Sequence, residues 1–277
     1  MRLAPSASLR SAPPPREEDL VSTQPKKSDL PVRTASAVVM IAVAGTALWL
    51  GGVVWMVFVA AVGFGVFFEW ARLILQGFKG PLARIFWIVS GVIYVGGACG
   101  LMLVIGIADA EVGRQMAAGA TYGFAQSGRA GVLLPLIASV VATDIGAYFV
   151  GRTIGGPKLA PRISPGKTWS GLIGGMLAAA PAYASATWYF DSDWSESMYF
   201  KFLVVGALAA IVAQCGDLFE SWLKRRANVK DSGGLLPGHG GLFDRVDGLL
   251  AVLFVASLTL VISFIEMLSL SKDLFSQ

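Results

Sequence analysis

Residues 201–226 read KFLVVGALAAIVAQCGDLFESWLKRR, and this stretch contains the pattern that decides the fold. The apolar run 201–223 has the roughly 20 residues that a helix needs to cross the hydrocarbon core of a membrane. Two acids, Asp217 and Glu220, lie near its end, and three basic residues close it. Acids inside a membrane span are costly and usually mark a functional site.

Similar apolar runs fill most of the chain. Six more lie near residues 35–50, 53–75, 85–108, 131–150, 170–190 and 247–269. Of the 277 residues, 55% are hydrophobic and 14% are charged, which is too little charge to cover the surface of a soluble domain. A transmembrane β-barrel would show short alternating segments instead. The sequence therefore predicts an all-α, polytopic membrane protein with about seven transmembrane helices.

The first 34 residues differ from the rest. They are rich in proline and in mixed charges and have little apolar content. This composition predicts a disordered cytoplasmic tail over 1–34 and a transmembrane catalytic domain over 35–277. Gly51 and Gly52 predict a tight turn between the first two apolar runs.

The distribution of basic residues predicts the orientation. With the N-terminus in the cytoplasm, seven alternating spans leave eighteen Lys and Arg residues on the inner side and four on the outer side. Segments flanking membrane spans on the cytoplasmic side carry such an excess. The side of the membrane with this excess is therefore predicted to be the cytoplasmic side.

Six acids lie inside the predicted spans. Five of them are near the cytoplasmic ends, and only Glu266 is at an outer end; the five are Glu69, Asp144, Asp217, Glu220 and Asp247. At 1.5 Å per residue, Asp144 and Asp217 lie roughly 10 Å below the inner loops. Carboxylates from different helices can share one depth only if positive charge lies between them.

The predicted inner loops 151–169 and 224–246 are rich in Gly, Lys and Arg. Glycine lets backbone N–H groups approach phosphate oxygens, and Lys and Arg neutralise those oxygens. Carboxylates beside such loops are typical ligands of a Mg²⁺ ion that bridges to substrate phosphates. The loop ending in Gly166 is not a Walker A motif, because Pro161 replaces the first glycine. We therefore expect phosphoryl or nucleotidyl transfer between a soluble phosphorylated substrate and a lipid.

The segment 221–247 resembles the signature of phosphatidate cytidylyltransferases (CDP-diacylglycerol synthases). It carries Ser-x-x-Lys-Arg from Ser221, Lys-Asp from Lys230, and Pro-x-His-Gly-Gly-x-x-Asp-Arg-x-Asp from Pro237. Segments 143–151, 164–169 and 216–221 are also similar to that family. The resemblance covers roughly residues 35–269.

The resemblance implies a reaction and its partners. A phosphate oxygen of phosphatidic acid attacks the α-phosphorus of CTP, pyrophosphate leaves, and CDP-diacylglycerol forms in the bilayer. Mg²⁺ is the implied cofactor, and a second metal ion would suit the attacking and leaving oxygens. No nucleic-acid partner is expected. Whether the chain forms a homodimer is left open.

The resemblance also implies the site residues. The catalytic candidates are Asp144, Asp217, Lys230, His239, Asp244 and Asp247. The substrate-binding candidates are Ser164, Lys167, Lys224, Arg225, Gly240, Gly241 and Arg245. The metal candidates are Asp144, Asp217, Asp244 and Asp247.

Several roles stay open from the sequence. His239 could act as a base, since histidine titrates near neutral pH, or it could contact phosphate or brace its loop. Glu220 is weighed evenly between a site role and a packing role. Glu69 is left out of the site, because snorkelling or a pair with Arg72 would account for it.

Three other functions are considered. A CTP-dependent lipid (polyprenol) kinase would use similar groups, but the full run from Pro237 to Asp247 argues against it. A CDP-alcohol phosphatidyltransferase would need an Asp-x-x-Asp-Gly-x-x-Ala-Arg run, which is absent. An ion-coupled transporter should carry its acids near the midplane and have related halves, whereas these acids lie toward one face.

Overall fold

The computed structural model describes residues 30–117, 128–190, 195–236 and 240–275. In that part of the chain, each predicted apolar run forms one helix, and the predicted all-α class is confirmed. The helices are α2 (Leu30–Leu50), α3 (Gly52–Gly77), α4 (Pro81–Ala117), α5 (Gly128–Thr153), α6 (Trp169–Phe190), α7 (Glu196–Arg226) and α8 (Phe243–Phe275).

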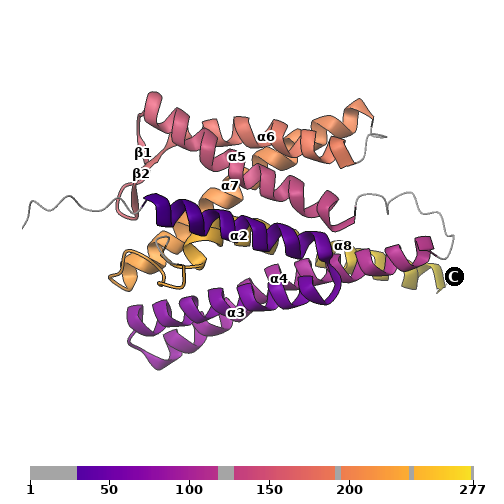
Figure 1. Ribbon diagram of the computed structural model, residues 1–277, viewed down its shortest axis with the longest axis horizontal. Coiled ribbons are helices and arrows are strands. Elements are labelled where there is room, and N and C mark those ends of the chain that lie inside the picture. Colours follow the sequence, from indigo (N-terminus) through magenta and orange to yellow (C-terminus); the bar gives the residue numbers. More distant parts are fainter. Residues whose placement is uncertain (1–29, 118–127, 191–194, 237–239, 276–277) are drawn as a thin grey trace, which may run out of the picture.

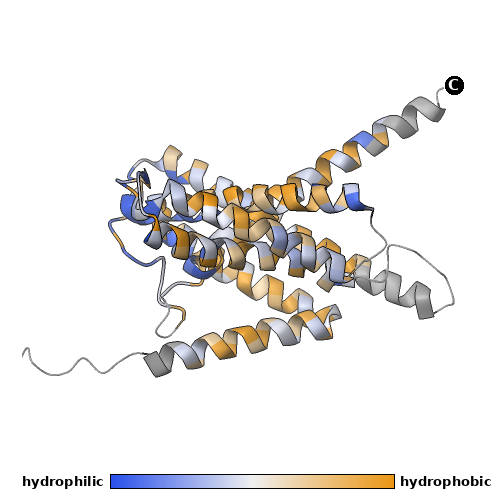
Figure 2. Ribbon diagram, turned by 90° about the horizontal axis from the view of Figure 1, so that it is seen from above, coloured by the Kyte–Doolittle hydropathy of each residue, from blue (hydrophilic) through white to orange (hydrophobic). Residues whose placement is uncertain are grey.

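The helices run up and down, so the segments predicted to be cytoplasmic gather at one end. Figure 1 places the start of α2, the α3–α4 turn, the α5–α6 connection and the α7–α8 connection at this end. Hydrophilic residues concentrate there in Figure 2. We call it the loop end of the bundle. The predicted alternation of the spans agrees with this arrangement, and the side of the membrane that the loop end faces stays a prediction.

Five helices of the described part have both the length and the hydropathy to cross a membrane, namely α3, α4, α5, α7 and α8. The apolar segment of α2 is shorter, Thr34–Leu50. Helix α6 is diluted by Gly, Ser, Thr and Tyr and is not among the five. The chain is therefore a helical membrane protein, and the count of seven crossings stays a prediction.

Two features differ from the expected organisation. Helix α2 begins at Leu30, inside the segment predicted to be a disordered tail over 1–34. Residues 1–29 of that tail lie outside the described residues. A short antiparallel hairpin, β1 (Lys158–Ala160) and β2 (Ser164–Thr168), precedes α6. These few residues have no apolar periodicity that would have predicted strands.

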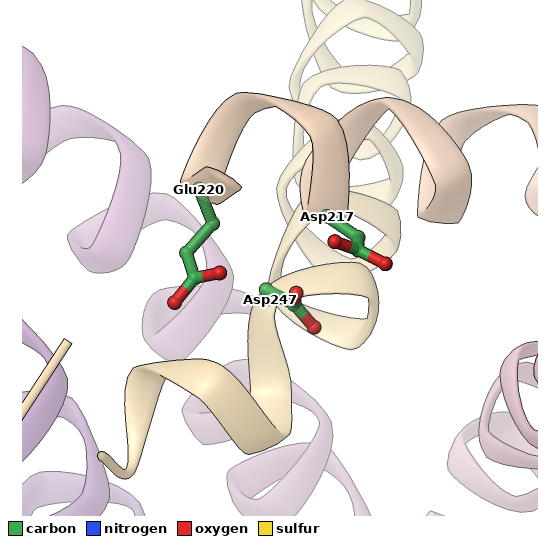
Figure 3. A group of neighbouring side chains, drawn as sticks. All are labelled: Asp217, Glu220 and Asp247. Carbon is green, nitrogen blue, oxygen red and sulfur yellow. The ribbon is translucent and has the colours of Figure 1, made fainter. Parts of the chain in front are cut away.

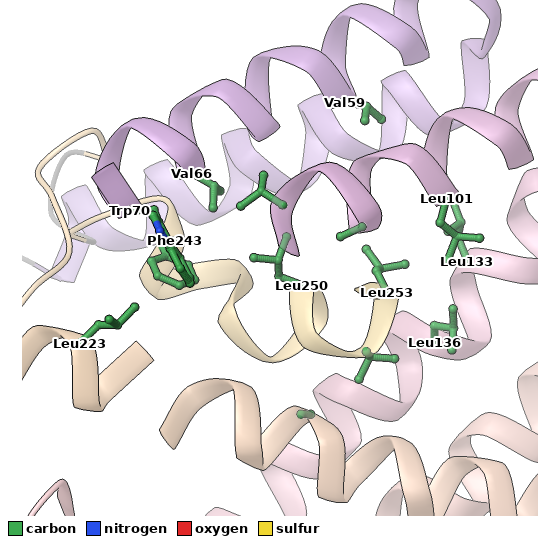
Figure 4. Close-up of a cluster of buried hydrophobic side chains, with 14 of the residues drawn as sticks. Val59, Val66, Trp70, Leu101, Leu133, Leu136, Leu223, Phe243, Leu250 and Leu253 are labelled. Carbon is green, nitrogen blue, oxygen red and sulfur yellow. The ribbon is translucent and has the colours of Figure 1, made fainter. Parts of the chain in front are cut away.

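The core lies between α3, α4, α7 and α8, and α5 adds Leu133 and Leu136 to it (Figure 4). Aromatic rings pack together around Trp70. Trp70 on α3 is 1% exposed, and its indole donates a hydrogen bond to the carbonyl oxygen of Trp87 at 2.9 Å. The rings of Phe219 and Phe243 lie 5.6 and 5.8 Å from the Trp70 ring. This packing fixes the start of α8 against α3 and α7.

Helices α5 and α6 approach each other closely because small residues line their contact. A Cβ atom on Gly146 of α5 would lie 2.6 Å from the carbonyl oxygen of Gly174 on α6. Small residues of this kind drive helix association in lipid, where the hydrophobic effect between helices is lost. The pair α5–α6 in turn packs on α7.

We predict that Gly146→Leu destabilises the protein by about 1–3 kcal/mol, since the added side chain overpacks the α5–α6 contact. Gly96→Leu on α4 is the matched control, because a Cβ atom there meets nothing within 4 Å. Thermal unfolding in detergent micelles measures both variants. Equal unfolding temperatures for the two variants would contradict the packing described for α5 and α6.

Candidate active site

Three carboxylates from two helices converge at the loop end. Asp217 and Glu220 lie on α7 and Asp247 lies on α8, and one oxygen of each is within 4.8 Å of the others. Figure 3 shows Asp217 and Asp247 side by side, with Glu220 one turn further along α7. Glycine at position 216 permits this approach, because a Cβ atom there would lie only 2.6 Å from the Asp247 carbonyl oxygen. The prediction that acids from separate helices gather in one region is confirmed for these three.

Asp144 adds a carboxylate from a third helix. It lies on α5 and interacts electrostatically with Asp217, Lys167 and Asp247. Its side chain is exposed in the structure, unlike the neighbouring Thr143, which is buried. Asp144 therefore adds an exposed carboxylate on the α5 side of the cluster.

Lys167 supplies positive charge to this cluster. Its Nζ lies 2.6 Å from Oδ2 of Asp217 and 3.4 Å from the Gln214 carbonyl oxygen. The adjacent Thr168 fixes this lysine at the start of α6, since its hydroxyl accepts the Gly171 N–H as an N-cap. The Ser170 hydroxyl donates to the Gly155 carbonyl oxygen and so anchors the hairpin connection.

Lys224 supplies the second positive charge. Its Nζ lies 2.5 Å from Oε2 of Glu220 and 2.7 Å from Oδ1 of Asp244, and its side chain is only 16% exposed. Glu220 is buried at 1% exposure. This lysine therefore links α7 to the first turn of α8 through two carboxylates.

Asp244 organises the glycine-rich loop between α7 and α8. Its Oδ2 accepts the N–H groups of Ser232 and Gly241, each at 2.9 Å. With Oδ1 bound to Lys224, both oxygens are engaged within the protein. Asp244 thus lies beside the three-carboxylate cluster, and its predicted role as a metal ligand stays a prediction.

Other predicted residues lie around this centre. Ser164 is the first residue of β2. Ile163 comes just before it, and its carbonyl oxygen accepts a hydrogen bond from Nε of Arg225 at 3.4 Å, which links the hairpin to α7. Lys230 and Arg245 are exposed at the loop end. Gly240 has φ of +83° and pairs with Leu236, a backbone conformation that favours glycine. His239 lies outside the described residues.

Glu69 has partners that the sequence did not predict. It neither snorkels to the surface nor depends on Arg72, because it is buried at 1% exposure and accepts hydrogen bonds from Ser232, Leu242 and Phe243. Its position at the same end of its span as the other acids was the available signal. Glu220, weighed evenly from the sequence, belongs to the three-carboxylate cluster.

The cluster fits a divalent cation. Carboxylate oxygens are the ligands that Mg²⁺ prefers. The three acids and Asp244 outnumber the two lysines that contact them. In the described part of the chain, Oε1 of Glu220 is buried without a hydrogen-bond partner. A buried carboxylate oxygen without a partner is costly, and a bound cation would relieve that cost.

We predict that Lys224→Met destabilises the protein by about 3 kcal/mol, because it leaves Glu220 and Asp244 without their shared cation. Lys230→Met is the control, since Lys230 is exposed. Unfolding of both variants in mixed detergent and dodecyl sulfate micelles measures the difference. A Lys224→Met protein as stable as the control would show that the two carboxylates do not need this lysine.

Comparison with known proteins supplies the family. Residues 100–263 match the model of the "Cytidylyltransferase family". A phosphatidate cytidylyltransferase of Brucella suis biovar 1 is 39% identical over 252 residues, which cover 81% of this chain and 90% of that protein. The protein of the same name from Rickettsia bellii is 45% identical over 115 residues, which cover 40% of this chain and 49% of that protein. The one from Pseudomonas aeruginosa is 45% identical over 123 residues, which cover 44% of this chain and 45% of that protein. The range matched by the family model includes the carboxylates of α5, α7 and α8. The chain therefore belongs to the phosphatidate cytidylyltransferase family.

Proposed function

We propose that the chain transfers CMP from CTP to phosphatidic acid, giving CDP-diacylglycerol and pyrophosphate. The observation that carries this proposal is the cluster of Asp217, Glu220 and Asp247 between Lys167 and Lys224, at the loop end of a membrane bundle. Such a site suits a soluble polyphosphate that meets a lipid phosphate. The names of the relatives support phosphatidate as the acceptor and a cytidylyl group as the group transferred.

The reaction is a displacement at phosphorus. An oxygen of the phosphatidate phosphate forms a bond to the α-phosphorus of CTP, and the bond from that phosphorus to the bridging oxygen breaks. Pyrophosphate leaves with the electron pair. Phosphatidate carries a nucleophilic oxygen at neutral pH, so the site has to align and neutralise the phosphates more than it has to remove a proton.

The protein groups divide this work between them. Lys167 is held by the β-hairpin and reaches the acids from the α6 side, which suits contact with a phosphate that approaches Asp217. Lys230, Arg225 and Arg245 are exposed around the same centre and suit the outer phosphates or the lipid headgroup. The glycines at 233 and 234 would also let backbone N–H groups approach phosphate oxygens.

Asp217, Glu220 and Asp247 would hold Mg²⁺, with Asp144 as a further ligand or as a neighbour of a second ion. When bound, the metal neutralises charge on the phosphates of CTP and on the departing pyrophosphate. The residues themselves order the site, because they come from rigid helices that pack closely.

The helices would span the inner (plasma) membrane of a bacterium. The site would lie at the cytoplasmic face of that membrane. The excess of Lys and Arg in the segments of the loop end supports this orientation. CTP is available on that side, and phosphatidic acid can enter from the adjacent leaflet.

The decisive experiment supplies the purified protein with labelled CTP, phosphatidic acid and Mg²⁺. We expect CDP-diacylglycerol and pyrophosphate, and no product after chelation of the metal until Mg²⁺ is added back. Thin-layer chromatography identifies the lipid product, and a coupled assay measures pyrophosphate. Release of CDP with a newly phosphorylated lipid would instead indicate a CTP-dependent kinase.

We predict that Asp217→Asn and Asp247→Asn each lower kcat by at least about 100-fold, which corresponds to about 2.7 kcal/mol of transition-state stabilisation. The reason is that each variant removes a carboxylate from the cluster while it keeps the shape of the side chain. Glu266→Gln is the control, because Glu266 is an exposed acid of α8. Near-normal turnover by Asp217→Asn or Asp247→Asn would remove that residue from the metal site.

A further inference from the structure

Glu69 of α3 holds the start of α8 although it is far away in the sequence. Its Oε1 accepts the Leu242 N–H at 3.0 Å, and its Oε2 accepts the Phe243 N–H at 2.8 Å and the Ser232 hydroxyl at 2.9 Å. Three donors from the glycine-rich loop and from the helix start thus meet one buried carboxylate.

The carboxylate satisfies a specific need of α8. The first N–H groups of a helix have no partner within the helix, and the N-terminus carries a partial positive charge. Helix α8 begins at Phe243, so Glu69 provides both an acceptor and a negative charge at this point. A side chain of another helix therefore takes the role that a local N-cap residue usually has.

The loop is shaped to fit this side chain. A Cβ atom on Gly233 would run into Oε1 of Glu69, and one on Gly241 would meet Oε2 at 2.6 Å. Both glycines thus leave space that the carboxylate fills. The close backbone approach explains why glycine stands at these two positions.

The same loop residues reach the reaction centre. Ser232 donates its hydroxyl to Glu69 and its N–H to Asp244, and Gly241 also donates to Asp244. Asp244 binds Lys224, which contacts Glu220. Asp247 lies four residues after Phe243, about one helical turn. The position of the α8 start therefore sets where Asp244 and Asp247 lie.

We propose that Glu69 is a positioning residue for cytidylyl transfer, which acts through Ser232 and the α8 N-terminus on Asp244 and Asp247. This inference rests on the proposed function. Glu69 lies behind the loop and does not contact substrate in this role. Loss of its charge would loosen the loop and displace two carboxylates of the centre without removing either one.

The test compares Glu69→Gln with Glu266→Gln, which makes the same change on an exposed acid of α8. In Glu69→Gln, an NH₂ group replaces one carboxylate oxygen. This group is a donor, so it faces the N–H or O–H donors that the carboxylate oxygen bound. Hydrogen exchange read by mass spectrometry should show faster exchange in peptides spanning 230–245 of Glu69→Gln. Peptides of α5 and α6 should stay as in the wild type.

Kinetics of the same proteins separate positioning from a loss of folded protein. We expect kcat of Glu69→Gln to fall about 10-fold or more, and the Mg²⁺ concentration for half-maximal rate to rise by a similar factor, as for residues that orient metal ligands. A smaller fraction of folded enzyme would lower the rate but leave the Mg²⁺ requirement unchanged. That second pattern would overturn the proposal.

Two further outcomes are also decisive. If Glu69→Gln does not fold, the variant Ser232→Ala is tested instead, because this change removes one donor to Glu69 and keeps the carboxylate. Wild-type hydrogen exchange in the 230–245 peptides together with a wild-type Mg²⁺ requirement in Ser232→Ala would overturn the proposal. A wild-type protein that forms no CDP-lipid overturns the proposed function. An active wild type with an equally active Glu69→Gln variant overturns the positioning role alone.

Discussion

Carboxylates buried at one end of a membrane bundle must be compensated, because little water is present to solvate them. This constraint accounts for the arrangement of the loop end. Lys167 meets Asp217, Lys224 meets Glu220 and Asp244, and backbone N–H groups meet the remaining oxygens of Asp244 and Glu69. The negative charge that remains on the cluster suits a divalent cation and, through it, the phosphates of a nucleotide.

The packing of the bundle keeps these charges close together. Aromatic rings around Trp70 lock α3, α4, α7 and α8 at the depth where the cluster lies. On the other side, small residues bring α5 and α6 together and place Asp144 and the hairpin beside α7. Because the helices are rigid and closely packed, they hold the carboxylates together against their mutual repulsion. The same rigidity keeps the carboxylates in fixed positions as metal ligands.

The site joins residues with very different sequence separations. The pair Asp217 and Glu220 is one helical turn apart, and this spacing alone places both on α7 near its basic end. Lys167 reaches Asp217 only because a hairpin and an N-cap turn the chain at Thr168. Glu69 meets Leu242 and Phe243 across more than 170 residues. No local pattern encodes a contact of that range.

The sequence by itself determined the helices, their alternation, the gathering of acids at one end and the family, because apolar run length, charge placement and fixed motif spacing are local properties of the chain. Only the tertiary structure decided which carboxylates share a centre, that Asp244 braces its loop, and that Glu69 supports α8. It also decided that α2 begins inside the expected tail and that a hairpin carries Lys167. These features depend on which helix faces pack together, and packing is settled by the whole bundle at once.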